Sequence, residues 1–99
     1  MHQVVYSLRA EAQLTRLFAQ IASAASPEVA ARYVDAIMNQ CNSLATFPER
    51  GTRRDDLWPG LRVLGFRRRV AIAFVVEENT VTVHGIFYGG QNLETGFEE

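Results

Sequence analysis

The sequence predicts a single α+β domain over residues 1–99. An N-terminal strand and an antiparallel helical hairpin precede a three-stranded antiparallel meander, and the helices pack on one face of the sheet. Three observations lead to this prediction. Two stretches with apolar residues at helical spacing, together about 8–46, are joined by only a few residues. Alternating apolar stretches with short turns follow over about 61–88. The chain of 99 residues has the length of one domain with one core, and we expect 89–99 to form a tail.

Start signals and apolar faces define the two predicted helices. Residues 4–6 are a short apolar strand candidate, and Ser7 can cap a first helix over 8–24. Ser26 and Pro27 repeat the start signal for a second helix that runs to about Thr46. The apolar faces comprise Leu14, Leu17, Phe18 and Ile21 in the first helix and Ala30, Tyr33, Val34, Ile37, Cys41 and Leu44 in the second. The short connection makes the helices antiparallel neighbours.

The middle strand of the meander, 70–76, is apolar on both faces. One face carries the large side chains Val70, Ile72, Phe74 and Val76, and the other carries Ala71, Ala73 and Val75. A single helical hairpin can cover only one face of such a small sheet. The second apolar face is therefore covered either by another chain or by the C-terminal tail.

The composition excludes several classes of protein. The hydrophobic content of 47% is that of a folded domain, and the net charge of −1 gives no global attraction to nucleic acid, so such binding would need a local patch. The single cysteine rules out an internal disulfide and a cysteine-rich metal site. The N-terminus lacks the pattern of a signal peptide, and no apolar run reaches the ~20 residues that span a bilayer. We expect a cytoplasmic protein that does not bind membranes.

The residues that usually carry catalysis or bind metals are sparse. Cys41 lies on the apolar stripe of the second helix, where we expect it in the core. His2 and His84 have no sequence neighbours at the spacing of a metal site. Gly89 and Gly90 lack the helix and basic residue that follow in a phosphate-binding loop. We therefore expect no metal and no cofactor.

The positive charge is concentrated in one region. All ten cations are arginines, and seven of them fall within the twenty residues 50–69. They can be solvated turn residues paired with Glu49, Asp55 and Asp56, which contributes little energy. They can equally form a recognition surface for carboxylates or phosphates, for which the guanidinium fork is well suited.

These features together resemble the ParE branch of the RelE/ParE superfamily of bacterial type II toxins. The resemblance covers almost the whole chain and rests on the order of the predicted elements and on four stretches. These are Tyr6 with Ser7, 47–51 (FPERG), 55–62 (DDLWPGLR) and 87–94 (FYGGQNLE). The sequence departs from the family pattern at Tyr88, where many relatives carry His, and at Asn92, where Asp is common.

The resemblance implies a toxin that causes growth arrest and is held inactive by a cognate ParD-like antitoxin, whose C-terminal segment wraps it. Operator DNA would then be contacted only indirectly, through the antitoxin. ParE-like toxins act on DNA gyrase without being hydrolytic enzymes, whereas RelE-like relatives cleave mRNA in the ribosome.

Chemistry favours the gyrase-directed, non-enzymatic function. RNA cleavage needs a base, an acid and a cation for the phosphate. The candidates here are Arg62, Arg69 and Tyr88, but Tyr has a pKa near ~10 and Arg cannot act as a base. A ribosome-dependent ribonuclease using these three residues remains the alternative, as does a non-toxic module that acts only in operon autoregulation.

Two sets of binding residues follow from this interpretation. We expect the antitoxin to pair its carboxylates with Arg62, Arg67 and Arg69 and to cover the small apolar face formed by Ala71, Ala73 and Val75. Strand addition at an open sheet edge would add to this contact. For the target, the candidates are Trp58, Tyr88, Gln91 and Asn92, which lie in a loop or near the C-terminal end.

Overall fold

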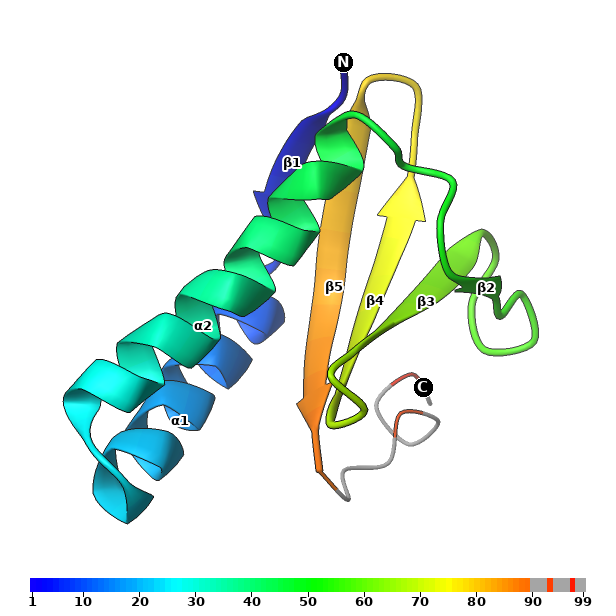
Figure 1. Ribbon diagram of the computed structural model, residues 1–99. Coiled ribbons are helices and arrows are strands. Elements are labelled where there is room, and N and C mark those ends of the chain that lie inside the picture. Colours follow the sequence, from blue (N-terminus) through cyan, green and yellow to red (C-terminus); the bar gives the residue numbers. More distant parts are fainter. Residues whose placement is uncertain (90–92, 94–96, 98–99) are drawn as a thin grey trace.

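The computed structural model describes residues 1–89, 93 and 97. Its elements are β1 (Gln3–Tyr6), α1 (Leu8–Ala24), α2 (Pro27–Asn42), the 3₁₀ helix η1 (Ser43–Ala45), β2 (Thr52–Arg53), β3 (Leu61–Phe66), β4 (Val70–Val76) and β5 (Thr80–Tyr88). The predicted α+β class and the order of the predicted elements are confirmed (Figure 1). Ser7 and Ser26 cap the helices as expected, because their side chains accept from the backbone N–H groups of Ala10 and Val29. The second helix ends earlier than predicted, since η1 replaces its last turn.

The sheet has five strands: the predicted three-stranded antiparallel meander is confirmed, and two further strands extend it beyond the prediction. Its order is β1-β5-β4-β3-β2. The meander β3-β4-β5 is present, but β1 joins it by pairing in parallel with β5, and β2 adds a two-residue antiparallel edge next to β3. The strand β2 was missed because two residues in a charged loop are too short to show an alternating pattern.

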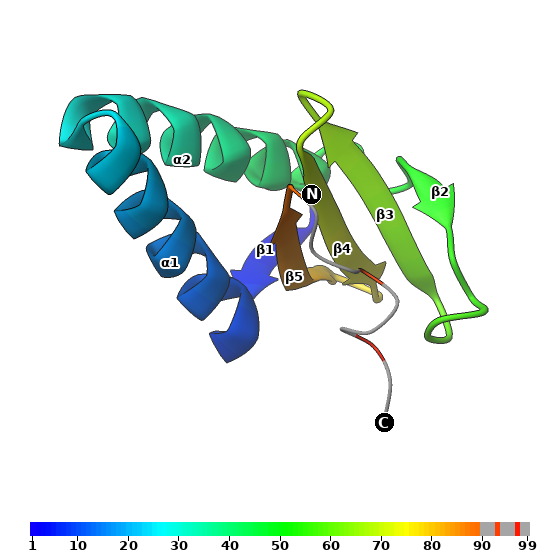
Figure 2. The ribbon, with the colours of Figure 1, turned by 90° about the horizontal axis from the view of Figure 1, so that it is seen from below.

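The main core lies between the helices and one face of the sheet, which we call the front face. Figures 1 and 2 show both helices on this side. Buried side chains from both layers meet there: Ala10, Leu14, Leu17, Ile37, Cys41, Leu44, Val70, Ile72, Phe74, Val81, Val83 and Ile86. The expected core position of Cys41 is confirmed. Phe18 differs from expectation, since it is 37% exposed and borders a groove between the helices with Val34 and Met38.

The opposite side of the sheet, the back face, carries a second apolar cluster. Leu61, Ala73 and Phe87 are its buried members, and Ala71 and Val75 pack against them. Leu57 from the loop before β3 and Leu93 and Phe97 from the C-terminal segment also pack here. The sequence left open whether a partner or the tail covers this face, and two tail side chains contact it.

Side chains of α1 cover the part of β5 that β1 does not reach. The strand β1 pairs only with residues 80–83 of β5. Beyond them, the side chains of Ser7 and Arg9 both donate to the His84 carbonyl at 3.1 Å, and Gln13 Oε1 accepts from the Ile86 N–H at 2.7 Å. His84 is the extra residue of a β-bulge, because Ala73 pairs with Gly85 while Phe74 pairs with Val83. These contacts occupy backbone groups that an added strand would otherwise use.

Candidate functional site

Polar and aromatic side chains gather at the end of the sheet where β3 turns into β4 and where β5 ends. We call this region the hairpin-end surface and define it by Arg16, Arg32, Tyr33, Arg67, Arg68, Arg69 and Tyr88. The turn and the end of β5 are adjacent because Val70 pairs with Tyr88 and the Gly89 N–H donates to the Arg69 carbonyl at 2.9 Å. The helices contribute Arg16 from α1 and Arg32 and Tyr33 from α2.

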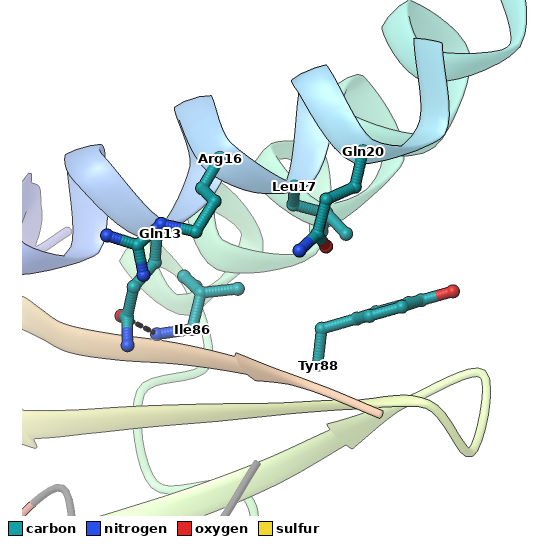
Figure 3. A pocket seen from close by; sticks show the side chains of 6 residues that line it. All are labelled: Gln13, Arg16, Leu17, Gln20, Ile86 and Tyr88. Atoms are coloured by element: carbon teal, nitrogen blue, oxygen red, sulfur yellow. Dashed lines mark hydrogen bonds between the residues drawn. The ribbon is translucent and has the colours of Figure 1, made fainter. Parts of the chain in front are cut away.

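Tyr88 lies at the floor of a small hollow between α1 and β5. Gln13, Arg16, Leu17, Gln20 and Ile86 form the rest of its lining (Figure 3). The hollow measures about 20 Å³, which is close to the space needed by one water molecule. It is too small to be a substrate pocket, since small-molecule sites usually measure ~300 Å³ or more. Its lining residues therefore belong to a surface rather than to an enclosed reaction site.

Tyr33 connects the helices to the β3–β4 turn. Its ring makes edge contacts with Phe66 at 6.0 Å and with Tyr88 at 6.1 Å between centroids. The Arg67 guanidinium lies 5.8 Å from the Tyr33 centroid and 4.8 Å from that of Phe66, which is the range of cation–π contacts. Burial, together with the neighbouring Tyr88, raises the pKa of Tyr33, while Arg67 and Arg69 act in the opposite direction. Tyr33 is thus neutral at physiological pH and offers a hydroxyl and an aromatic face.

The turn holds two arginines in an unfavourable backbone conformation. Arg67 has φ 50° and Arg68 has φ 63°, in the left-handed region that suits Gly or Asn. For other residues this conformation costs roughly 1 kcal/mol each. No glycine occupies either position, so the turn retains arginine side chains at a conformational cost. Strain of this kind is found preferentially at functional sites.

The arginines of the 50–69 region fall into two groups. Arg53 and Arg54 form paired contacts with Asp55 and Asp56, each with an N–O distance of 2.9 Å, as the solvated-turn interpretation predicts. Arg53, together with the Gly60 N–H, lowers the pKa of Asp55 to about 2. By contrast, Arg67, Arg68 and Arg69 are exposed and form no ion pair with any other residue that the structure describes.

The three candidate ribonuclease residues do not lie together. Arg69 and Tyr88 are neighbours at the hairpin end, but Arg62 lies near the other end of β3, opposite Phe74. Arg62 precedes Phe66 by four positions, which is about 13 Å along a strand at roughly 3.3 Å per residue. Its guanidinium is directed to the Arg50 carbonyl, 3.5 Å away.

The six residues predicted to bind an antitoxin are likewise divided between surfaces, which corrects the expectation of one continuous patch. Ala71, Ala73 and Val75 belong to the back face. Arg62 and Arg67 belong to the front side, because Arg62 alternates with Leu61 and Val63 along β3 and Arg67 contacts Tyr33. Ala73 has no exposed surface, so only Ala71 and Val75 are accessible to another chain.

The predicted target-binding residues differ in where they lie in the structure. Trp58 is 45% exposed in the loop before β3. Tyr88 belongs to the hairpin-end surface. Gln91 and Asn92 lie outside the described residues.

Sequence reasoning missed the contribution of the helices to this site. Tyr33 was assigned only to the apolar stripe of α2, and Arg16, Arg32 and Gln13 were not singled out. The positions of Arg16 and Gln13 near Tyr88 depend on how α1 crosses β5, and no local pattern records that crossing. Arg32 precedes Tyr33 in the sequence and could have been noticed as a cation beside an aromatic residue.

Within the described residues, no group of three or more His, Cys, Asp or Glu side chains is arranged to hold a metal ion. No helix in the same part of the chain has both the length and the apolar character needed to cross a membrane.

Comparisons with known proteins agree with this architecture. The family model described as the ParE toxin of the type II toxin-antitoxin system parDE matches residues 4–93. No curated protein matches the sequence. Among solved structures, the chromosomal ParDE toxin-antitoxin system from P. aeruginosa contains a similar chain with a TM-score of 0.78 and 23% sequence identity. The match covers 90% of the present chain and 97% of the other. At this identity the structural likeness concerns the fold.

Proposed function

The chain belongs to the ParE toxin family of type II toxin-antitoxin systems, and we propose that it inhibits DNA gyrase by binding rather than by hydrolysis. The observation that supports a non-hydrolytic mode is the separation of Arg62 from Arg69 and Tyr88. A ribonuclease holds its base, its acid and its phosphate-binding cation within hydrogen-bond reach of one scissile bond. About 13 Å along β3 separates the backbone level of Arg62 from that of the turn, and the Arg62 guanidinium lies at the Arg50 carbonyl, 3.5 Å away.

The surroundings of Tyr88 support the same conclusion. The hollow beside it is lined by two glutamines, an arginine and two aliphatic side chains. Amides do not take up protons at neutral pH, and an arginine remains protonated. Neither histidine nor carboxylate is present among these lining residues.

A ParD-like antitoxin is the proposed neutralising partner. We propose that it contacts the back face at Ala71 and Val75, next to Leu93 and Phe97. On the front side it would contact Arg62 and Arg67, and it would also contact Arg69 in the β3–β4 turn. A segment that wraps the toxin can reach both regions, whereas a compact domain cannot. In the complex, where the antitoxin occupies Arg67 and Arg69, the toxin would contact operator DNA only through this antitoxin, and both would be located in the cytoplasm.

The proposed gyrase contacts are Trp58 and Tyr88, with Gln91 and Asn92 included because they lie near the C-terminal end. Trp58 supports this assignment because a large aromatic side chain that is 45% exposed can provide an anchor in a partner's pocket.

Supercoiling of relaxed plasmid by purified gyrase and ATP tests the proposal. We expect the protein to inhibit supercoiling and to trap cleaved DNA, and the antitoxin to relieve both effects. Growth arrest with a DNA damage response is the corresponding cellular result. Translation arrest with cleaved mRNA would replace this function by ribosomal cleavage. Folded protein without either effect would identify an autoregulatory module.

A further inference from the structure

We propose that the hairpin-end surface binds the phosphate backbone of duplex DNA directly, so that the toxin contacts both gyrase and the DNA segment that gyrase holds. This inference deepens the proposed function and rests on it for its biological setting. The binding itself is a property of this chain and can be measured without gyrase.

Three consecutive arginines concentrate positive charge at the β3–β4 turn. Arg67, Arg68 and Arg69 project from one exposed turn, and Arg32 borders the same hollow as Arg67. The acidic residues Glu77 and Glu78 lie at the opposite end of β4, in the turn before β5. The length of the strand separates these two carboxylates from the turn, whereas Glu28 lies four positions before Arg32 in α2. The net charge of −1 therefore includes a local cluster of three arginines at this turn.

Within the part of the chain that the structure describes, no carboxylate neutralises these guanidinium groups, although that of Arg67 lies against the rings of Phe66 and Tyr33. Asp55 and Asp56 pair with Arg53 and Arg54, whereas the hairpin arginines and Arg32 form no ion pair among residues 1–89, 93 and 97. The left-handed conformation of Arg67 and Arg68 shows that the turn keeps arginine where Gly or Asn would be relaxed.

The hollow next to Arg67 carries side chains that suit a phosphate ligand. The hollow next to Arg67 measures about 270 Å³ and is lined by Val29, Arg32, Tyr33 and Arg67. It is open and combines two guanidinium groups with aromatic and aliphatic side chains. Guanidinium forks bind phosphate oxygens in a bidentate manner. Duplex DNA carries one negative charge per ~1.7 Å of its axis. Several arginines of the turn can therefore contact phosphates at the same time, whatever the base sequence. These contacts would position the toxin on DNA without reading bases.

The experiment measures fluorescence anisotropy of a labelled duplex of random sequence with the full-length toxin over a salt series. The test variant is Arg67→Asn with Arg68→Asn, because Asn tolerates the left-handed conformation. The matched control is Arg53→Gln with Arg54→Gln, which removes the same number of charges from a region already paired with carboxylates. Circular dichroism and thermal melting confirm that each variant is folded.

We expect wild-type affinity to fall steeply with salt, since each neutralised phosphate adds roughly −0.9 to the log–log slope. The Asn variant should bind at least about tenfold more weakly, with a slope closer to zero by about 2. The Gln control should change affinity by less than about twofold. Absence of wild-type binding at low salt, or equal slopes for wild type and the Asn variant, would overturn the proposal.

Two further measurements separate this inference from the function on which it rests. If wild type binds DNA as described but does not inhibit gyrase, the DNA contact stands and the gyrase assignment fails. If wild type inhibits gyrase and the Asn variant inhibits it equally well, DNA contact at this surface is rejected while the gyrase assignment stands. If the Asn variant loses only affinity for the antitoxin, the arginines serve an acidic protein segment and the inference is wrong.

Discussion

Gln13 shows how one side chain can complete the fold. Its amide oxygen accepts from the Ile86 N–H at 2.7 Å, where β1 no longer covers β5. Removing the acceptor leaves a partly buried donor without a partner, which costs about 1–3 kcal/mol. We therefore expect Gln13→Ala to lower the free energy of unfolding by about 1–3 kcal/mol in urea denaturation. Gln20→Ala is the control, since Gln20 borders the same hollow but is exposed, and it should change stability by less than about 0.5 kcal/mol.

Cys41 is expected to be chemically inert. Its side chain has no exposed surface, and burial raises the pKa of its thiol to about 11. Because the thiolate is the reactive form, folded protein should not react with a thiol reagent at pH 8 within the time that denatured protein reacts completely. Reaction is followed by absorbance with an aromatic disulfide reagent. Equal rates in native buffer and in guanidinium would contradict the burial of this residue.

His84 links stability to pH. Burial and, to a smaller extent, Arg9 lower its pKa in the folded protein, while Glu77 opposes the shift. A lowered pKa means that the unfolded chain binds the proton more strongly, so the stabilisation is present above pH ~6.5 and is lost as the pH falls through the folded-state value. We expect the free energy of unfolding to decrease from pH 7.5 to pH 5. The decrease should be smaller for His84→Gln, and an unchanged pH profile in this variant would exclude His84 as the cause.

The β3–β4 turn gives a prediction at the scale of an element. Arg68 has φ 63°, whereas Arg69 is not among the residues with positive φ. Glycine relieves the strain at Arg68, so Arg68→Gly should raise the free energy of unfolding by about 0.5–1 kcal/mol. Arg69→Gly removes the same side chain from an unstrained position and should lower it by a similar amount. Thermal melting compares the two. A loss of stability in both would show that the Arg68 side chain stabilises the turn more than its backbone strains it.

The elements also show what sequence patterns can and cannot predict. Caps at Ser7 and Ser26 and the alternation in 70–76 are local signals, and the structure places helices and strands accordingly. The pairing of β1 with β5 joins residues almost eighty positions apart and leaves no local pattern. The strain at Arg67 and Arg68 was missed because arginines are not the residues expected in a left-handed turn. The predicted antitoxin patch is divided because the side chains of Arg62 and Ala71 lie on opposite faces of the sheet. Their faces can be compared only when the pairing register of β3 with β4 is known.

At the scale of the whole molecule, the proposed gyrase contact Trp58 and the proposed DNA contact lie at the two ends of β3, while Tyr88 lies beside the DNA contact. Trp58 precedes the start of this strand, and the arginine turn follows its end. The strand contains six residues, so the two regions are separated by about 17–20 Å at roughly 3.3 Å per residue. Changes at such a distance, without shared partners, usually have additive effects on free energy.

This geometry predicts the outcome of combining variants in the supercoiling assay. Trp58→Ala should raise the concentration for half-maximal inhibition by about 30-fold, the effect of losing an anchor worth roughly 2 kcal/mol. Arg67→Asn with Arg68→Asn should raise it by about tenfold through the DNA contact. If both regions act at once, the combined variant should show the product of the two factors, about 300-fold. A combined effect no larger than that of Trp58→Ala alone would contradict this prediction. It would mean that the toxin uses only one end of β3 at a time, so that removing the second contact does not weaken inhibition further.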